Sequence, residues 1–366
     1  MTRIELRSDN TAGVVPEILE AVSRANAGTA LAYGGDELTA QLESVVREVF
    51  EHPTAHVFPV TSGTAANALS LSSLCPPWGS VLCHESAHIL NSECASTSLL
   101  GGGAAIRGIP GTDFRISPDS VQDTFDGIRW GDPHHSQPAV LSFTQPTDMG
   151  TIYSLDEIAG VVAVAKTRGL RIHIDGARVA NALVALDCSP ADLTWRSGVD
   201  VLSLGATKNG ALSAEAIVAF DDRAAEELVY RTKRAGHVTS KLRFQSAQLI
   251  AYLSDGLWLR TAANSNARMA ELAAGLAALG VEFVNRPDVN MVFAYVDDAT
   301  ADQLEAAGLL FYRMGRGTIR LVTSWQTTVK DIEVALAAFE TALTSRCQEP
   351  QQIDPQPPVP GTAAVE

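Results

Sequence analysis

The sequence predicts an α/β fold in which a mostly parallel central sheet precedes a smaller α+β module. Strand-like and helix-like segments alternate from about residue 55 to residue 204, and three long helical segments then follow without a strand between them. Alternation on this scale is typical of a parallel sheet covered by helices on both faces. With 366 residues, 46% of them hydrophobic, the chain is long enough to bury two unequal cores.

Five short apolar runs in the first part have the length of buried strands. They span residues 55–60, 81–84, 139–143, 171–174 and 199–204. Helices are expected at residues 65–74, 87–96, 154–168 and 179–186. The helix at 154–168 has the clearest boundaries, because Ser154 and Glu157 form a capping-box sequence at its start and Gly169 follows its end.

The second part of the sequence indicates a small α+β module behind a run of helices. Helices are expected at residues 224–234, 244–258, 259–279, 300–307 and 329–345, with strands at 281–284, 291–296 and 319–323. We therefore expect an N-terminal segment (1–50), a large domain (51–255), a small domain (256–346) and a Pro-rich tail (347–366). The tail is expected to be disordered, because it has too little apolar surface to offset the entropy lost on ordering.

The composition argues against several classes of function. Lys and Arg number 27 against 42 Asp and Glu, and the resulting net charge of −15 disfavours nucleic acid as a partner. No apolar run reaches the roughly 18 residues of a membrane span, and the N-terminus lacks the apolar run of a signal peptide. The five cysteines are odd in number and lack metal-finger spacing. We expect a cytoplasmic enzyme with reduced thiols, no metal site and no membrane partner.

The first chemical motif is the segment 171–178, Arg-Ile-His-Ile-Asp-Gly-Ala-Arg, in which an apolar strand ends at Asp175. Ligands of open α/β sheets bind beyond the carboxyl ends of strands, so this carboxylate is placed to face one. A metal, a ribose or a protonated pyridine would suit it. The alternative is a turn residue that caps the helix beginning near Arg178.

The second motif is a single lysine, Lys208, just after the apolar strand at 199–204. A lysine beside a buried strand is costly unless it is exposed or functional. One such function is a Schiff base with pyridoxal phosphate, since desolvation lowers the pKa of the amine. A surface lysine in a loop is the alternative.

The third motif is the segment 61–67, Thr-Ser-Gly-Thr-Ala-Ala-Asn, in which a strand turns directly into a helix. The free backbone N–H groups and the positive end of that helix would suit a phosphate. The spacing is neither that of a P-loop nor that of a dinucleotide fingerprint. The alternative is an ordinary helix cap.

In this order, the three motifs resemble the pyridoxal-phosphate enzymes of the aspartate-aminotransferase-like fold, also called fold type I. Up to about residue 346, the sequence resembles the threonine aldolase family of that fold, which includes β-eliminating lyases and low-specificity L-threonine aldolases. The matching segments follow the family's order along the chain: Leu6-Arg-Ser-Asp-Asn10, Tyr33-Gly-Gly-Asp36, Ser62-Gly-Thr-Ala-Ala-Asn67, Glu85-Ser-Ala-His88, Asp175-Gly-Ala-Arg178, Thr207-Lys-Asn-Gly210 and Ile319-Arg-Leu-Val-Thr323.

The resemblance implies a covalently bound cofactor, pyridoxal 5′-phosphate. Lys208 is expected to form the Schiff base, Asp175 to pair with the pyridine nitrogen and keep it protonated, and His88 to stack on the ring face. These three residues are the expected catalytic set. The other residues expected to bind the cofactor are Ser62, Gly63, Thr64, Arg178 and Thr207, with Gly63 and Thr64 acting through backbone N–H groups.

The resemblance also implies an amino-acid substrate and a symmetric assembly, a homodimer or homotetramer. Ser8, Arg178 and Arg320 are expected to bind the substrate carboxylate, for which a planar guanidinium is a natural bidentate partner. Tyr33 is expected to reach the site of a neighbouring subunit, and the segment 1–50 to pack at the dimer interface. A basic segment at residues 233–243 matches a family position near the partner's phosphate.

One segment departs from the family. Many members carry Glu-Asn-Thr-His-Asn after the strand that ends here at Phe143, and their histidine lies near the substrate hydroxyl. Here residues 144–150 read Thr-Gln-Pro-Thr-Asp-Met-Gly and contain no histidine. The base that removes the β-hydroxyl proton is therefore open among His88, a water held by His88 or His134, and Asp148. His173 alternates within a strand and is interpreted as a buried, hydrogen-bonded histidine.

The function implied is a lyase that cleaves β-hydroxy-α-amino acids such as L-threonine or L-allo-threonine to glycine and an aldehyde. A phenylserine aldolase, a glycine-transferring transaldolase and a β-eliminating lyase remain open on the same scaffold. A non-catalytic binding module is disfavoured, because the expected lysine, aspartate and arginines are all present.

Overall fold

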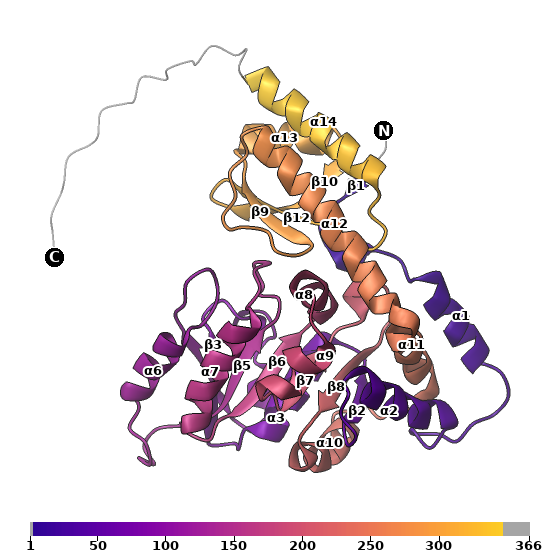
Figure 1. Cartoon of the computed structure of the whole chain (residues 1–366), viewed down its shortest axis with the longest axis vertical. Coiled ribbons are helices and arrows are strands. Elements are labelled where there is room, and N and C mark those ends of the chain that lie inside the picture. Colours follow the sequence, from indigo (N-terminus) through magenta and orange to yellow (C-terminus); the bar gives the residue numbers. More distant parts are fainter. Residues whose placement is uncertain (1–2, 347–366) are drawn as a thin grey trace, which may run out of the picture.

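The computed structural model describes residues 3–346, which form a large α/β part and a smaller part above it in Figure 1. The strands of the large part are β2 (His56–Val60), β3 (Gly79–His84), β4 (Ala105–Ile109), β5 (Gln137–Thr144), β6 (Arg171–Gly176), β7 (Val201–Leu204) and β8 (Glu215–Ala219). They form one seven-stranded sheet in the order β2-β8-β7-β6-β5-β3-β4. β8 runs antiparallel to both of its neighbours, whereas the other neighbouring pairs are parallel. The predicted mostly parallel sheet is confirmed.

Both faces of this sheet are covered, because alternate side chains along each strand enter different cores. On β3, Val81 belongs to one core and Leu82 to the other. The first core is closed by α3 (Gly63–Leu74) and α10 (Asp222–Arg234), which contact each other. The second core is closed by α6 (Pro118–Asp126), α7 (Leu155–Thr167), α8 (Val179–Leu186) and α9 (Pro190–Leu193).

The helix boundaries confirm one expectation and correct another. Ser154 and Glu157 form the capping box of α7, as predicted. The single helix expected at 87–96 is wrong, since the chain forms two short helices there, α4 (His88–Asn91) and α5 (Ser96–Leu100). Cys94 and Ala95 separate them with φ angles of 50° and 57°, in the left-handed region. Glu93 lies in the connection between the two helices and is buried.

Two strands of the large sheet lie outside the strands expected from the sequence. β4 is an edge strand whose residues Arg107 and Gly108 are exposed, so it lacks a continuous apolar run. β8 begins with a buried carboxylic acid, Glu215, which interrupts the apolar pattern. A charged residue at such a position is rare unless it has partners, and it marks the wall of the cavity described below.

The helices α1 (Pro16–Ala25) and α2 (Glu37–Val49) both pack against α11 (Arg243–Leu253). α12 (Leu257–Ala278) follows α11 after a turn in which Asp255 and Gly256 have φ angles of 52° and 65°. In Figure 1, α12 runs from the large sheet up to the small part of the molecule. The run of helices expected between the two parts is therefore present.

The small part is the α+β module expected from the sequence. Its elements are β9 (Met291–Tyr295), α13 (Asp298–Ala306), β10 (Leu309–Leu310), β11 (Tyr312–Gly315), β12 (Thr318–Val322) and α14 (Val329–Arg346). The antiparallel order is β11-β12-β9, whereas β10 pairs in parallel with β1 (Ile4–Glu5) from the start of the chain. The strand expected at 281–284 is wrong, because that segment makes only an isolated bridge from Phe283 to Ala294. The boundaries at 50, 255 and 346 stay a prediction, and the tail at 347–366 lies outside the described residues.

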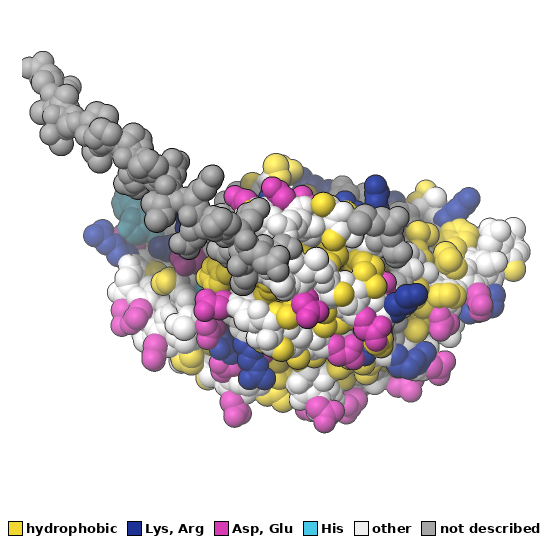
Figure 2. Space-filling view, turned by 90° about the horizontal axis from the view of Figure 1, so that it is seen from above, with side chains coloured by type: hydrophobic (Ala, Val, Ile, Leu, Met, Phe, Trp, Pro, Cys, Tyr) yellow, Lys and Arg dark blue, Asp and Glu magenta, His cyan; other side chains and the backbone are white. Residues whose placement is uncertain are grey.

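The surface in Figure 2 shows acidic side chains scattered among basic and apolar ones over the upper face of the molecule. This distribution agrees with the net charge of −15. Among the described helices, none has the length and apolar character needed to cross a membrane.

Candidate active site

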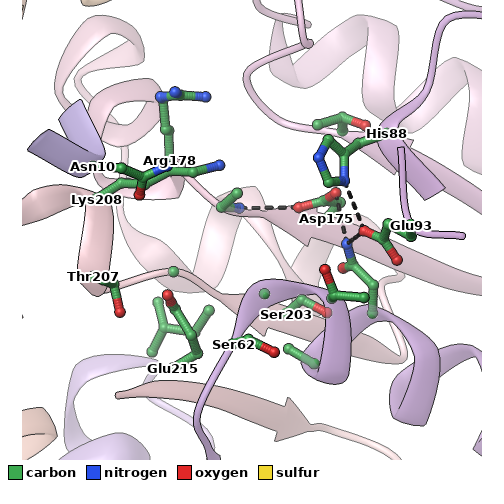
Figure 3. Close-up of a pocket in the computed structure, with 18 of the residues that line it drawn as sticks. Asn10, Ser62, His88, Glu93, Asp175, Arg178, Ser203, Thr207, Lys208 and Glu215 are labelled. Carbon is green, nitrogen blue, oxygen red and sulfur yellow. Dashed lines mark hydrogen bonds and ion pairs between the residues drawn. The ribbon is translucent and has the colours of Figure 1, made fainter. Parts of the chain in front are cut away.

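A cavity of about 300 Å³ lies at the carboxyl ends of the parallel strands, where ligands of open α/β sheets bind. Residues that end or follow β2, β5, β6 and β7 line it, together with the start of α3. The predicted site residues that line the cavity are Ser62, Gly63, Thr64, His88, Asp175, Arg178, Thr207 and Lys208. In Figure 3, Lys208 and Arg178 lie on one side of the cavity and His88 and Glu93 on the other. Three motifs far apart in the sequence therefore meet in one place.

Asp175 is the next-to-last residue of β6 and is buried at the cavity wall. Its Oδ1 accepts a hydrogen bond from the backbone N–H of Ala177 at 3.1 Å, and its Oδ2 accepts one from Asn67 Nδ2 at 2.9 Å. α8 begins after Arg178 without any side-chain cap. The alternative interpretation of Asp175 as a helix cap is therefore wrong.

A hydrogen-bonded chain joins Asp175 to His88 across the cavity wall (Figure 3). Glu93 Oε1 lies 2.8 Å from His88 Nδ1 and also accepts a hydrogen bond from Asn67 Nδ2 at 2.8 Å. Glu93 is completely shielded from solvent, so its charge is little screened. Its hydrogen bond raises the pKa of His88 against the opposing effect of burial, and the charges of Asp148 and Asp175 add to this. His88 is therefore held toward its protonated form.

The turn into α3 has the features of an anion site. Ser62 caps the helix, with its Oγ accepting a hydrogen bond from Ala65 N–H at 3.2 Å. The N–H groups of Gly63 and Thr64 make no hydrogen bond to any described residue, and both residues line the cavity. A Cβ placed on Gly63 would meet nothing within 4 Å. The turn therefore leaves room for a group to approach the backbone closely.

Lys208 follows β7 in a short 3₁₀ turn, Thr207–Asn209, and lines the cavity. This position does not fit the alternative of a surface lysine. The positive charge of Arg178, together with burial, lowers the pKa of Lys208, although Asp9, Asp175 and Glu215 oppose the shift. A lowered pKa makes more of the neutral amine available as a nucleophile.

Arg178 is oriented by a buried acid from the start of the chain. Its Nε and one terminal nitrogen donate to the two carboxylate oxygens of Asp9 at 2.5 and 2.9 Å. Burial alone would raise the pKa of Asp9, but the charge and hydrogen bonds of Arg178 hold it below its ordinary value. Asn290 Nδ2 also donates to Asp9, at 3.1 Å. The remaining amino group of Arg178 makes no hydrogen bond within the described part of the chain.

Three predicted substrate-binding residues do not line the cavity. Ser8 caps a short turn and accepts a hydrogen bond from Asn10, which does line it. Arg320 donates to the carbonyl oxygen of Arg7 at 3.1 Å, while its Nε is buried without a partner. Burial and the nearby charge of Arg178 lower the pKa of Arg320. The roles of Ser8 and Arg320 stay predictions.

Tyr33, the third of these residues, lies on the surface. The residue is 58% exposed, and the Lys233 ammonium lies over its ring, 4.3 Å from the ring centroid. Two residues expected at a neighbouring subunit's site are therefore in contact with each other on the outside of this subunit. Their role toward a neighbour stays a prediction.

Glu93 and Glu215 line the cavity without any expectation from the sequence. Glu215 pairs with Val60 across the β2–β8 ladder, directly before the turn into α3, and accepts a hydrogen bond from Ala206 N–H at 2.6 Å. Burial raises the pKa of Glu215 despite this bond. A glutamate inside the apolar run Ala-Glu-Ala-Ile-Val-Ala was a readable signal for it. For Glu93, the only signal in the sequence was its spacing from His88.

His173 is buried and hydrogen-bonded, as expected. Its Nδ1 lies 2.9 Å from Ser142 Oγ and its Nε2 lies 2.9 Å from Ser203 Oγ. Burial lowers the pKa of His173 to about 4, so the ring is neutral and supports the cavity wall at Ser203. His134 is exposed in a loop and does not line the cavity.

The fold and site define an enzyme of the aspartate-aminotransferase-like class. Aspartate aminotransferase from Thermus thermophilus shares the fold with a TM-score of 0.66 at 16% identity, covering 93% of this chain and 91% of that one. Threonine aldolase from Leishmania major matches with a TM-score of 0.87 at 26% identity, covering 93% and 99% of the two chains. A low specificity L-threonine aldolase from a Pseudomonas species is 39% identical over 88% of this chain and 93% of the relative.

The model of the beta-eliminating lyase family matches residues 5–299. The chain belongs to this family. The fold class and the family predicted from the sequence are thereby confirmed.

Proposed function

We propose that this chain is a pyridoxal-phosphate-dependent aldolase that cleaves β-hydroxy-α-amino acids of the L-threonine or L-allo-threonine type to glycine and an aldehyde. The observation that carries the proposal is that four groups line one cavity. They are the turn at residues 62–64, here called the anion turn, the carboxylate of Asp175, the amine of Lys208 and the guanidinium of Arg178. These groups suit, respectively, a phosphate, a pyridine nitrogen, an aldehyde carbon and a substrate carboxylate.

The residues present fit this cofactor. The open space beside Gly63 suits the phosphate, as do the N–H groups of Gly63 and Thr64, which make no hydrogen bond to the described residues. Asp175 suits the protonated ring nitrogen, and Lys208 suits the covalent link. When bound, pyridoxal phosphate supplies an electron-withdrawing ring that delocalises the electron pair left on Cα.

The protein's own residues then orient the substrate. Arg178 lines the cavity and is held by Asp9 through Nε and one amino group, so its other amino group is available to a substrate carboxylate. A carboxylate bound there would fix the rotation about the N–Cα bond. This rotation decides which bond at Cα stands perpendicular to the ring and breaks. Glu93 holds His88 in one orientation at the opposite wall, where we infer that it stacks on the ring.

The direct test is aldehyde release from a panel of β-hydroxy amino acids. L-Threonine and L-allo-threonine should yield acetaldehyde and glycine, and an aryl analogue should yield the aryl aldehyde. Lys208→Ala should lose the visible absorption of the bound cofactor and slow turnover by several orders of magnitude. Keto acid or ammonia in place of glycine would replace the aldolase assignment by a transaminase or a β-eliminating lyase. Glycine transfer to a second aldehyde would identify a transaldolase.

We further propose a homodimer or homotetramer in the cytoplasm. The contact between exposed Tyr33 and Lys233 supports a surface completed by a second subunit, because both residues were expected at a neighbour's site. Cys75, Cys83, Cys94 and Cys188 are free thiols, which is usual in a reducing compartment. An active monomer at all concentrations in analytical ultracentrifugation would contradict the assembly.

A further inference from the structure

We propose that Asp148 is the catalytic base that takes the β-hydroxyl proton during aldol cleavage. The inference rests on the proposed function and names the residue that performs one step of it. It arises from the segment 144–150, which lacks the histidine that many members of the family carry there.

Asp148 is fixed at the cavity beside the histidine expected to stack on the cofactor. It lines the cavity, and its Oδ2 accepts a hydrogen bond from the backbone N–H of His88 at 2.9 Å. Its other oxygen, Oδ1, accepts no hydrogen bond from any described residue. The loop behind it is anchored through Thr147 and Thr151, whose hydroxyl oxygens lie 2.7 Å apart. A hydrogen-bonded loop therefore places Asp148 at the cavity with one carboxylate oxygen that accepts no hydrogen bond from the described residues.

The other carboxylates that line the cavity are Glu93, Asp175 and Glu215, and each accepts at least one hydrogen bond. Glu93 bonds to His88, Asn67 and Ser96, and both oxygens of Asp175 accept hydrogen bonds. Glu215 lies at the end of the cavity beside the anion turn.

The contact with Glu93 that orients His88 also makes His88 a poor acceptor of the β-hydroxyl proton. Its Nδ1 faces the buried Glu93 carboxylate, which favours the imidazolium form, and an imidazolium has no lone pair to offer. His134 is exposed and does not line the cavity, so it is not placed to hold a water there. A water on protonated His88 would accept a hydrogen bond from the ring, and the ring could not take up a proton from it. Asp148 remains as the acceptor with a free oxygen.

The proton balance of the step is simple. Asp148 takes the proton of the β-hydroxyl, and the electrons of that O–H bond become the second bond of the aldehyde carbonyl. The Cα–Cβ bond breaks at the same time, and its electron pair stays on Cα of the glycine fragment. A proton added to Cα completes glycine, so nothing is oxidised or reduced.

The electrostatic setting suits a base that works near neutral pH. Burial and the charge of Asp175 raise the pKa of Asp148 to about 6, against the opposing charges of His88 and Lys208. The other ionisable groups coupled to it are Cys83, Arg178 and Arg320. Above this pKa the carboxylate accepts a proton, and below it the group is already protonated. Cleavage should therefore slow as the pH falls through about 6.

The test uses the cofactor-loaded enzyme and the nearly isosteric variant Asp148→Asn. An amide oxygen still accepts from His88 N–H, so the loop geometry is preserved, but the amide takes no proton. We expect cofactor absorption and affinity to stay as in the wild type, while the cleavage rate falls by about 10²–10⁴-fold and loses its decline at low pH. Exchange of the glycine α-proton in D₂O, followed by NMR, should persist, since glycine has no β-hydroxyl.

Two comparisons make the outcome decisive. Asp148→Glu should recover part of the cleavage rate and a low-pH decline, whereas Asp113→Asn, an exposed acid packed near Thr151, should change nothing. Cleavage by Asp148→Asn within about threefold of the wild type would overturn the proposal, as would loss of glycine exchange along with cleavage. A wild-type enzyme that exchanges glycine but releases no aldehyde would instead refute the proposed function.

Discussion

Replacing Gly63 by alanine tests whether the turn into α3 holds the phosphate of the cofactor. The backbone of Gly63 lies outside the left-handed region, and a Cβ there meets nothing within 4 Å, so the fold itself tolerates the change. Alanine in place of glycine at a compatible position stabilises a protein by about 0.4–1 kcal/mol. The free energy of unfolding of the apoprotein should therefore stay level or rise.

Cofactor binding should respond in the opposite direction. The added methyl group occupies the space in which a phosphate would approach the N–H groups of Gly63 and Thr64. A hydrogen bond to a charged group is worth about 1.5–3 kcal/mol, so loss of one such bond raises the dissociation constant of pyridoxal phosphate by about 10- to 150-fold. Cofactor titration by absorbance and chemical unfolding of the apoprotein measure the two effects separately.

The matched control is Gly127→Ala at the end of α6, outside the cavity lining, where φ is −82° and a Cβ would meet neighbours only at 3.6 Å or more. This change should leave the cofactor affinity unchanged. A Gly63→Ala protein that folds normally and binds the cofactor with wild-type affinity would refute the reasoning, because the phosphate would then have to lie elsewhere. Equal losses of affinity in both variants would point to a general effect on the sheet.

Three further substitutions address the carboxylates of the site. Asp175→Asn should reduce turnover far more than stability, since an amide cannot keep the ring nitrogen protonated; near-normal turnover with an unchanged cofactor spectrum would contradict its role. In the wild type, cofactor affinity should decline as the pH rises, because burial raises the pKa of Glu215 and its ionised form repels a phosphate. Glu215→Gln should remove this decline, and parallel curves of affinity against pH for the two proteins would rule the effect out. Glu93→Gln should lower the pKa of His88 in an NMR titration. In the wild type, the raised pKa of His88 adds to the free energy of unfolding at low pH, and this gain is lost as the pH rises through the pKa of folded His88. The variant should lack this gain. An unmoved His88 titration would show that Glu93 does not control it.

The sequence predicted the site best where function follows from a strand end. Asp175 and Lys208 each follow a short apolar run, and the carboxyl ends of parallel strands meet at one edge of the sheet. The anion turn was readable for the same reason, since a strand passes directly into a helix. The resemblance to a known family then supplied roles that spacing alone does not.

The partners of these residues were not predictable, because they are brought together by the tertiary fold. Asp9 pairs with Arg178 although 169 positions separate them, and no local pattern encodes that contact. Glu93 reaches His88 only because the chain breaks between α4 and α5, where a continuous helix was expected. β8 was missed because its first residue, Glu215, interrupts the apolar pattern of a buried strand. A glutamate is found at this position because it lines the cavity, which the sequence of the strand does not show.

The pairing of the first residues with the last strands has a consequence for biosynthesis. β1 pairs with β10, Leu6 accepts a hydrogen bond from Val322 N–H, and Asp9 is held by Asn290. Leu6 and Asp9 thus leave the ribosome more than 280 positions before their partners Val322 and Asn290. Contacts of such long sequence separation form late because the connecting chain must be closed first. A nascent chain can therefore build the large sheet well before Arg178 is locked in place, so the cavity should be complete only after residues 290–322 have emerged.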